Sequence, residues 1–159
     1  MLTPQLVMYE EEVRQIQNVA DRLQEDSRSR AILVVDKNGQ LIAASGSASD
    51  LDTTSLSSLV AGNVAATGGI ASLIEEEEFT GQFHEGKGKS VHMTIVARKM
   101  ILAVLFDKST TQGLVKLRVK KATGELETIL AEVDKKAASG KNDVFSEITD
   151  ADIDNLFND

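Results

Sequence analysis

The feature that most constrains this chain is an uncharged run without proline that extends from residue 53 to residue 74. Asp52 or Thr53 can cap the start of a helix over this run. One set of residues recurs at steps of three and four, which places its members on one helical face. We predict that this face lies on the protein's own sheet; its residues are Leu56, Leu59, Val60, Asn63, Thr67, Ile70 and Ile74.

The opposite face of this helix is predicted to carry only small side chains. Its residues are Ser58, Ala61, Ala65, Gly68, Gly69 and Ser72. An ordinary surface helix carries Lys and Glu on its outer face, and glycine inside a helix costs ~1 kcal/mol relative to alanine. Small side chains let another backbone approach closely. The covering polypeptide is either a partner or a second helix of the same chain, and the spacing alone does not decide between them.

Composition excludes several classes of function. The 159 residues suit one domain, and a hydrophobic content of 42% can build a core. A net charge of −8 argues against nucleic acid and anionic membranes and favours a basic protein surface as partner. There is no cysteine, which excludes disulfides and thiolate zinc sites and fits a cytoplasmic protein. We see no signal peptide and no apolar run near the ~20 residues of a membrane span.

The rest of the chain predicts an α+β domain. A first helix follows Pro4 and ends near Ser27, and Asn38-Gly39 is a strong hairpin turn between strands at 31–35 and 40–45. Further strands are expected at 80–85, 90–96 and 100–106, the last at the sheet centre. Residues 114–120 could alternate as a strand, but a longer window favours a helix. The predicted order is helix, two strands, long helix, three strands and helix, a two-layer fold with a five-stranded antiparallel sheet.

The C-terminal region is predicted to be separate from this domain, which spans residues 1–136. Residues 137–142 are expected to form a flexible linker, and Thr149 can cap a short helix whose apolar face is Ile153, Leu156 and Phe157. So short a helix is marginal alone in water. It docks either on its own domain or in a partner's groove.

Tests for catalytic chemistry are negative. Lys89 and Ser90 follow a glycine as in a P-loop, but Phe83 stands where the first glycine is required and a strand follows. His84 and His92 match no metal motif, and no nucleophile elbow or Ser-His-Asp pattern is found. We therefore expect no cofactor and no active site of its own. The run at 75–78 is interpreted as a solvated acidic helix end, with a recruiting surface for a basic partner as the alternative.

Several long segments together resemble a known family. They are Leu6–Glu12, Val35–Ile42, Asp52–Leu56, Ala61–Ala66, Gln82–Gly86 and Asp152–Phe157. On these residues the chain resembles the Roadblock/light-chain family, and within it the bacterial proteins of gliding motility and cell polarity. The main departures are the glutamate run and the region around Gly140.

This resemblance implies a homodimeric regulator that accelerates GTP hydrolysis by a small Ras-like GTPase. It places the GTPase over the small face (Ser58, Ala61, Ala65, Gly68, Gly69 and Ser72) and over Ile153, Leu156 and Phe157. It pairs the edge strand, with Gln82, Phe83 and His84, to its copy across the dimer axis. It further implies that the regulator reshapes the GTPase so that the GTPase's own Arg and Gln become catalytic. A Roadblock-type scaffold that binds partners without changing a rate is the alternative.

Overall fold

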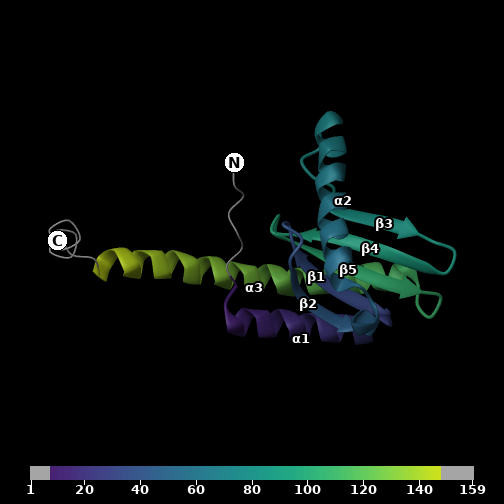
Figure 1. The fold of residues 1–159 in the computed structure, drawn as a ribbon, viewed down its shortest axis with the longest axis horizontal. Coiled ribbons are helices and arrows are strands. Elements are labelled where there is room, and N and C mark those ends of the chain that lie inside the picture. The colour runs from purple at the N-terminus through teal and green to yellow at the C-terminus, as the bar shows by residue number, and fades with distance from the viewer. Residues whose placement is uncertain (1–7, 148–159) are drawn as a thin grey trace.

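The computed structural model describes residues 8–147 of the chain. Its elements follow the predicted order (Figure 1): α1 (Glu10–Ser27), β1 (Ala31–Asp36), β2 (Leu41–Gly46), the 3₁₀ turn η1 (Ser47–Asp50), α2 (Thr53–Leu73), β3 (Gly81–Glu85), β4 (Lys89–Val96), β5 (Met100–Asp107) and α3 (Gln112–Glu147). The five strands form one antiparallel sheet in the order β2-β1-β5-β4-β3. The predicted α+β class, element order and sheet are confirmed.

Helices cover both faces of this sheet, so the domain has three layers and the predicted two-layer arrangement is wrong. Alternate residues of β1 enter different cores, because successive side chains of a strand point to opposite faces. Ile32 and Val34 pack with α1 and α3, whereas Leu33 and Val35 pack with α2. This explains why β1 is buried along its whole length.

The β1–β2 hairpin turns at Asn38 and Gly39 as predicted. Asp36 Oδ1 accepts hydrogen bonds of 2.9 Å from the backbone N–H groups of Asn38 and Gln40. Gly39 has a φ of +90°, and a Cβ there would lie 3.2 Å from the Cα of Ser58 in α2. Glycine therefore serves both the turn and the close approach of α2.

The start of α2 is as predicted, but its orientation on the sheet is not. Asp52 caps the helix, with Oδ1 accepting from the Ser55 N–H at 3.1 Å. The residues that α2 buries are Ser57, Val60, Ala61, Val64 and Ala71. The predicted core face is thus wrong by part of a turn: Leu59, Ile70 and Ile74 are 70%, 53% and 62% exposed.

The same uncharged sequence makes α2 long and apolar enough, by length and composition alone, to cross a membrane. The expectation that no segment meets this criterion is therefore wrong. One such helix is weak evidence for a membrane span, because core helices of soluble proteins share this length and composition. The buried residues of α2 pack on β1 and β5 within the smaller core.

The last helix, α3, differs from its prediction by its length. Residues 137–142, predicted to form a linker, and residues 143–147, predicted to begin the tail, continue the helix to Glu147. At ~1.5 Å per residue its 36 residues span about 54 Å, and it extends well beyond the sheet (Figure 1). Lys136 Nζ lies 2.5 Å from Oε1 of Glu12 and fixes this extension to α1. The predicted helix at 149–157 lies outside the described residues.

Candidate functional site

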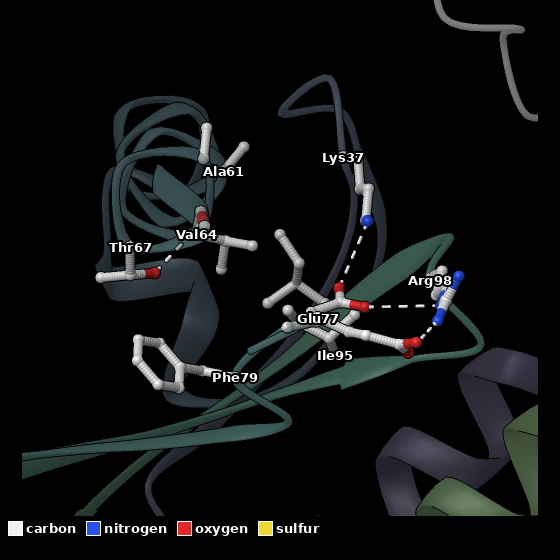
Figure 2. A pocket seen from close by; sticks show the side chains of 12 residues that line it. Lys37, Ala61, Val64, Thr67, Glu77, Phe79, Ile95 and Arg98 are labelled. Atoms are coloured by element: carbon white, nitrogen blue, oxygen red, sulfur yellow. Dashed lines mark hydrogen bonds and ion pairs between the residues drawn. The ribbon is translucent and has the colours of Figure 1, made fainter. Parts of the chain in front are cut away.

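A cleft of about 520 Å³ opens between α2 and the sheet (Figure 2). One wall is α2, the floor is formed by Ile95 and Ile101 of β4 and β5, and the loop after α2 closes one end. The lining residues are Lys37, Ala61, Val64, Ala65, Thr67, Gly68, Glu77, Glu78, Phe79, Ile95, Arg98 and Ile101. The cleft is therefore mostly apolar inside, and its charges gather at the rim.

Three ion pairs at this rim hold the loop after α2 against two turns of the sheet. Glu78 Oε1 lies 3.3 Å from Lys37 Nζ in the β1–β2 turn. Arg98 of the β4–β5 turn places Nη2 2.6 Å from Glu77 Oε2 and Nε 3.9 Å from Glu78 Oε2 (Figure 2). The interpretation of the run 75–78 as a solvated end therefore needs correction for Glu78, whose side chain is only 21% exposed, whereas Glu77 remains 84% exposed. Such exposed pairs contribute only about 0–1 kcal/mol each, so their main effect is to fix the loop's position.

The predicted small face of α2 lies beside this cleft. Ala61, Ala65 and Gly68 line the cleft, whereas Ser58, Gly69 and Ser72 are exposed beside it. Ala61 also packs on the sheet and is only 8% exposed. No helix in the described part of the chain covers this face, because α1 and α3 lie on the other side of the sheet. The alternative in which a second helix of the same chain covers it is therefore wrong for residues 8–147.

A second surface on α2 was missed in the sequence. Leu59, Ile70, Leu73 and Ile74 form an apolar strip, defined here by these four residues, and all four are more than half exposed. At 100° per residue the strip is centred well apart from both the small face and the buried face. The sequence signal was present, because the helix holds more apolar residues than one face can bury. We assigned three of these residues to the core instead.

The predicted pairing strand β3 is an edge strand, hydrogen-bonded within the described chain only to β4. Gln82 Nε2 donates to Thr67 Oγ1 at 2.7 Å and ties the strand to α2. Phe83 points to the other face, where its ring stacks on Phe106 with centroids 5.9 Å apart. Only His84 is exposed among the three predicted interface residues, so pairing to a copy would use mainly the backbone of this edge.

Two titratable groups near the sheet, His92 and Asp107, have shifted pKa values. His92 is buried beside α3, where desolvation, and to a lesser degree the charge of Lys116, lowers its pKa. Its Nε2 lies 3.0 Å from Thr94 Oγ1. Asp107 has a strongly lowered pKa because Ser109 and Arg30 donate hydrogen bonds to it. Each shift has a structural cause within the fold, and His92 and Asp107 lie outside the cleft.

The fold and this uncovered helix face define a class of protein. The Roadblock/LC7 domain family matches residues 15–106, and the chain belongs to this family. The match runs from within α1 to the end of β5 and leaves α3 outside it.

Within the family the chain is MglB-like. It is similar to MglB of Myxococcus xanthus, with 54% identity over 80% of this chain and 96% of that one and a TM-score of 0.77. The gliding protein MglB of Thermus thermophilus shares 28% identity over 82% of this chain and 99% of its own, with a TM-score of 0.76. A Roadblock/LC7 domain of Streptomyces avermitilis, at 10% identity over 72% of this chain and 97% of its own and a TM-score of 0.66, shows the fold alone. A search of curated proteins found no match.

Proposed function

We propose that this protein is a GTPase-activating regulator of a small Ras-like GTPase of the MglA type, in cell polarity and gliding motility. It acts in the cytoplasm as a homodimer and needs no cofactor or active site of its own. The observation that carries the proposal is the small face of α2, which is uncharged, is not covered by another helix in residues 8–147, and adjoins an open cleft. The identity with a gliding-motility relative supplies the class of partner.

The GTPase would lie on the small face, with Ser58, Ala65, Gly69 and Ser72 under it and Ala61 and Gly68 at the cleft wall. At Gly68 and Gly69 an added Cβ would meet nothing within 4 Å in the described structure, so glycine is not required by the fold there. Close approach of a partner backbone is a reason for glycine at these positions. We assign the additional contact to Ile153, Leu156 and Phe157, which lie outside the described residues.

The homodimer would use the apolar strip and the β3 edge. Both surfaces are unpartnered in the described monomer, and burying apolar side chains contributes ~25 cal/mol per Å². A relative has been described as MglB with a tetrameric arrangement, which supports self-association in this group. The contact between two copies then includes Gln82, Phe83 and His84.

Activation by positioning is the mechanism we favour. GTP hydrolysis needs an oriented water and positive charge on the developing transition state. A dimer that binds the hydrolysis-ready GTPase conformation more tightly shifts the population towards it. The GTPase's own Arg and Gln then supply the catalytic groups.

Arg98 is the rival source of an inserted positive charge, because it is exposed at the cleft rim. Arg118, by contrast, lies on α3, across the sheet from the cleft. Replacing Arg98 by alanine should leave activation largely intact. A loss of ~10³-fold in the hydrolysis rate would instead identify an inserted finger.

Ala65→Arg and Gly69→Arg test the proposed surface. Each should abolish binding and activation of the cognate GTPase while the homodimer persists, since the new side chain occupies the partner's place. Single-turnover GTP hydrolysis measures activation, and light scattering measures the oligomer. Ala131→Arg, at an exposed alanine of α3, is the matched control and should behave as wild type.

These assays also separate the alternatives. GTPase binding without rate acceleration by the wild-type protein would establish a Roadblock-type scaffold instead. Unchanged binding by both arginine variants would refute the small face as the GTPase surface.

A further inference from the structure

The turn after β5 and the first half of α3 concentrate positive charge in an otherwise acidic protein. Residues 108–124 contain five cations and no Asp or Glu, so the rest of the chain carries −8 − 5 = −13. The cations are Lys108, Lys116, Arg118, Lys120 and Lys121. None of them forms an ion pair with a carboxylate among residues 8–139, whose side chains the structure describes.

Three of these lysines surround an exposed leucine. Lys116 and Lys120 are one helical turn apart, as are Leu117 and Lys121, so the four side chains share one surface. We call these four residues the basic face. All are exposed, Leu117 by 61%. Like charges one turn apart destabilise a helix, so nothing within the helix accounts for this arrangement.

Two further features lie beside the basic face. Arg118 Nε is buried without a hydrogen-bond acceptor in the described chain. The groove between α1 and α3 beside it holds Asp26 and Glu125, but Glu125 is already paired with Arg22 at 3.1 Å. Gly124 lies two turns from Leu117, and a Cβ there would meet nothing within 4 Å. The basic face is therefore both uncompensated in charge and open to close approach.

The C-terminal segment of the same sequence has the complementary character. Residues 143–159 carry six acidic residues and no Lys or Arg, together with the apolar residues Ile153, Leu156 and Phe157. Its acidic residues complement the charge of the three lysines, and its apolar side chains can pack on Leu117.

The first apolar residue of this segment's predicted face, Ile153, cannot reach Leu117 of its own chain. Leu117 lies 30 residues before Glu147 on α3, about 45 Å along the helix. Ile153 is six residues beyond Glu147 and can extend at most about 20 Å from it. A contact between Ile153 and Leu117 is therefore possible only between copies.

We propose that the basic face of α3 binds the acidic C-terminal segment, residues 143–159, of another copy of this chain. The basic face lies across the sheet from α2 and does not overlap the small face, but this contact uses Ile153, Leu156 and Phe157, which the proposed function also assigns to the GTPase, so one copy of the segment makes one contact at a time. It links copies in addition to any pairing through α2 and β3.

A cross-linking experiment with the full chain tests this contact, because the protein has no natural cysteine. Mixing the single-cysteine variants Lys120→Cys and Asp154→Cys under mild oxidation should give a disulfide between the two copies. Lys135→Cys, at another exposed lysine of α3, replaces Lys120→Cys in the control mixture and should give at least about tenfold less product. Equal yields in both mixtures would overturn the proposal.

A binding experiment with a labelled peptide of residues 143–159 gives the second readout. The peptide should bind the full-length protein, more weakly at high salt, and the triple variant Lys116→Glu, Lys120→Glu and Lys121→Glu should weaken binding at least about tenfold. Leu117→Ser should weaken it without a charge change, and Lys135→Glu should not. The proposal would be overturned if Gly69→Arg lost peptide binding while the triple lysine variant kept it. It would also be overturned if the three lysines bound the protein to phosphatidylserine vesicles equally well with and without the peptide.

Discussion

The two faces of the central sheet differ in how completely the chain covers them. On one face α1 and α3 pack side by side and bury large side chains such as Ile16, Leu126 and Leu130. On the other face the single helix α2 buries only Val60, Ala61, Val64, Ala71 and Ser57. The first face is completed within one chain, whereas the second is left partly open.

The charged residues follow the same division. On the covered face Lys136 forms an ion pair with Glu12, whose side chain is almost completely buried, and Arg22 pairs with Glu125 between α1 and α3. α2 carries no charged residue at all, and its apolar strip is exposed. The comparison shows that the buried sides of α1 and α3 complete the larger core, and it supports the proposal that α2 contacts partners.

The largest expected difference between the two faces of the sheet is in the free energy of unfolding that is lost when a core side chain is shortened. Leu126→Ala on the covered face should lower the free energy of unfolding by about 2–5 kcal/mol, because it leaves a cavity among rigid neighbours. Val64→Ala on the α2 face should cost only about 1–2 kcal/mol, since fewer methyl groups are removed beside an open cleft. Urea denaturation at one protein concentration measures both. Equal losses would contradict the contrast between the two faces.

The apolar strip should matter for association and not for the monomer. The double variant Ile70→Asp and Leu73→Asp should raise the dissociation constant of the homodimer by at least about 100-fold, or ~2.7 kcal/mol. Secondary structure should be unchanged, because both side chains are more than half exposed in the monomer. Analytical ultracentrifugation measures the constant, with Thr128→Asp on α3 as control. An unchanged constant would place the dimer contact elsewhere.

The ion pair between α1 and α3 should make stability depend on pH. The pKa of Glu12 lies below its ordinary value of 4.5, mainly because Lys136 donates a hydrogen bond to it. The Glu12 carboxyl group thus binds its proton less tightly in the folded state than in the unfolded state. The ion pair with Lys136 therefore stabilises the fold above pH 4.5. Its contribution is lost as the pH falls from 4.5 through the lowered pKa.

Glu12→Gln removes this titration. Thermal melting of the variant between about pH 6 and pH 3 should therefore show a smaller acid-induced loss than the wild type, superimposed on the losses from Asp52 and Asp107, whose pKa values are also lowered. Parallel curves for the two proteins would show that the pair does not contribute.

The smallest effect is expected at the cleft rim. Lys37→Ala removes the 3.3 Å pair with Glu78, and the free energy of unfolding should change by less than about 1 kcal/mol because both groups contact solvent. Urea denaturation measures the change. A larger loss would mean that the loop after α2 supports the fold as well as shaping the cleft.

Local signals in the sequence were sufficient for much of this architecture. The cap at Asp52, the turn at Asn38-Gly39 and the apolar strand 100–106 each depend on a few neighbouring residues, and each lies where it was predicted. The small face was also found from spacing, and it remains uncovered by other helices of the described chain. Its role as the GTPase surface stays a prediction.

The errors share a cause. The prediction that Leu59, Ile70 and Ile74 face the core depends on their spacing at steps of three and four, and the two-layer prediction considers one long helix on a face of the sheet. Neither uses contacts between distant segments. The end of α3 was set at residue 136 because composition becomes polar and small there. Lys136 and Glu12 lie at opposite ends of the domain sequence. Their ion pair therefore cannot be predicted from the residues next to either of them.

The sequence by itself determined which segments are helix or strand, where the turns fall, and that one helix carries a face without charge or bulk. These properties arise from backbone preferences and side-chain periodicity over a few residues. Only the tertiary structure decided which side of α2 meets the sheet and that α1 and α3 lie across from it. That choice depends on the packing of distant residues against one another, and it is what left the apolar strip and the small face open.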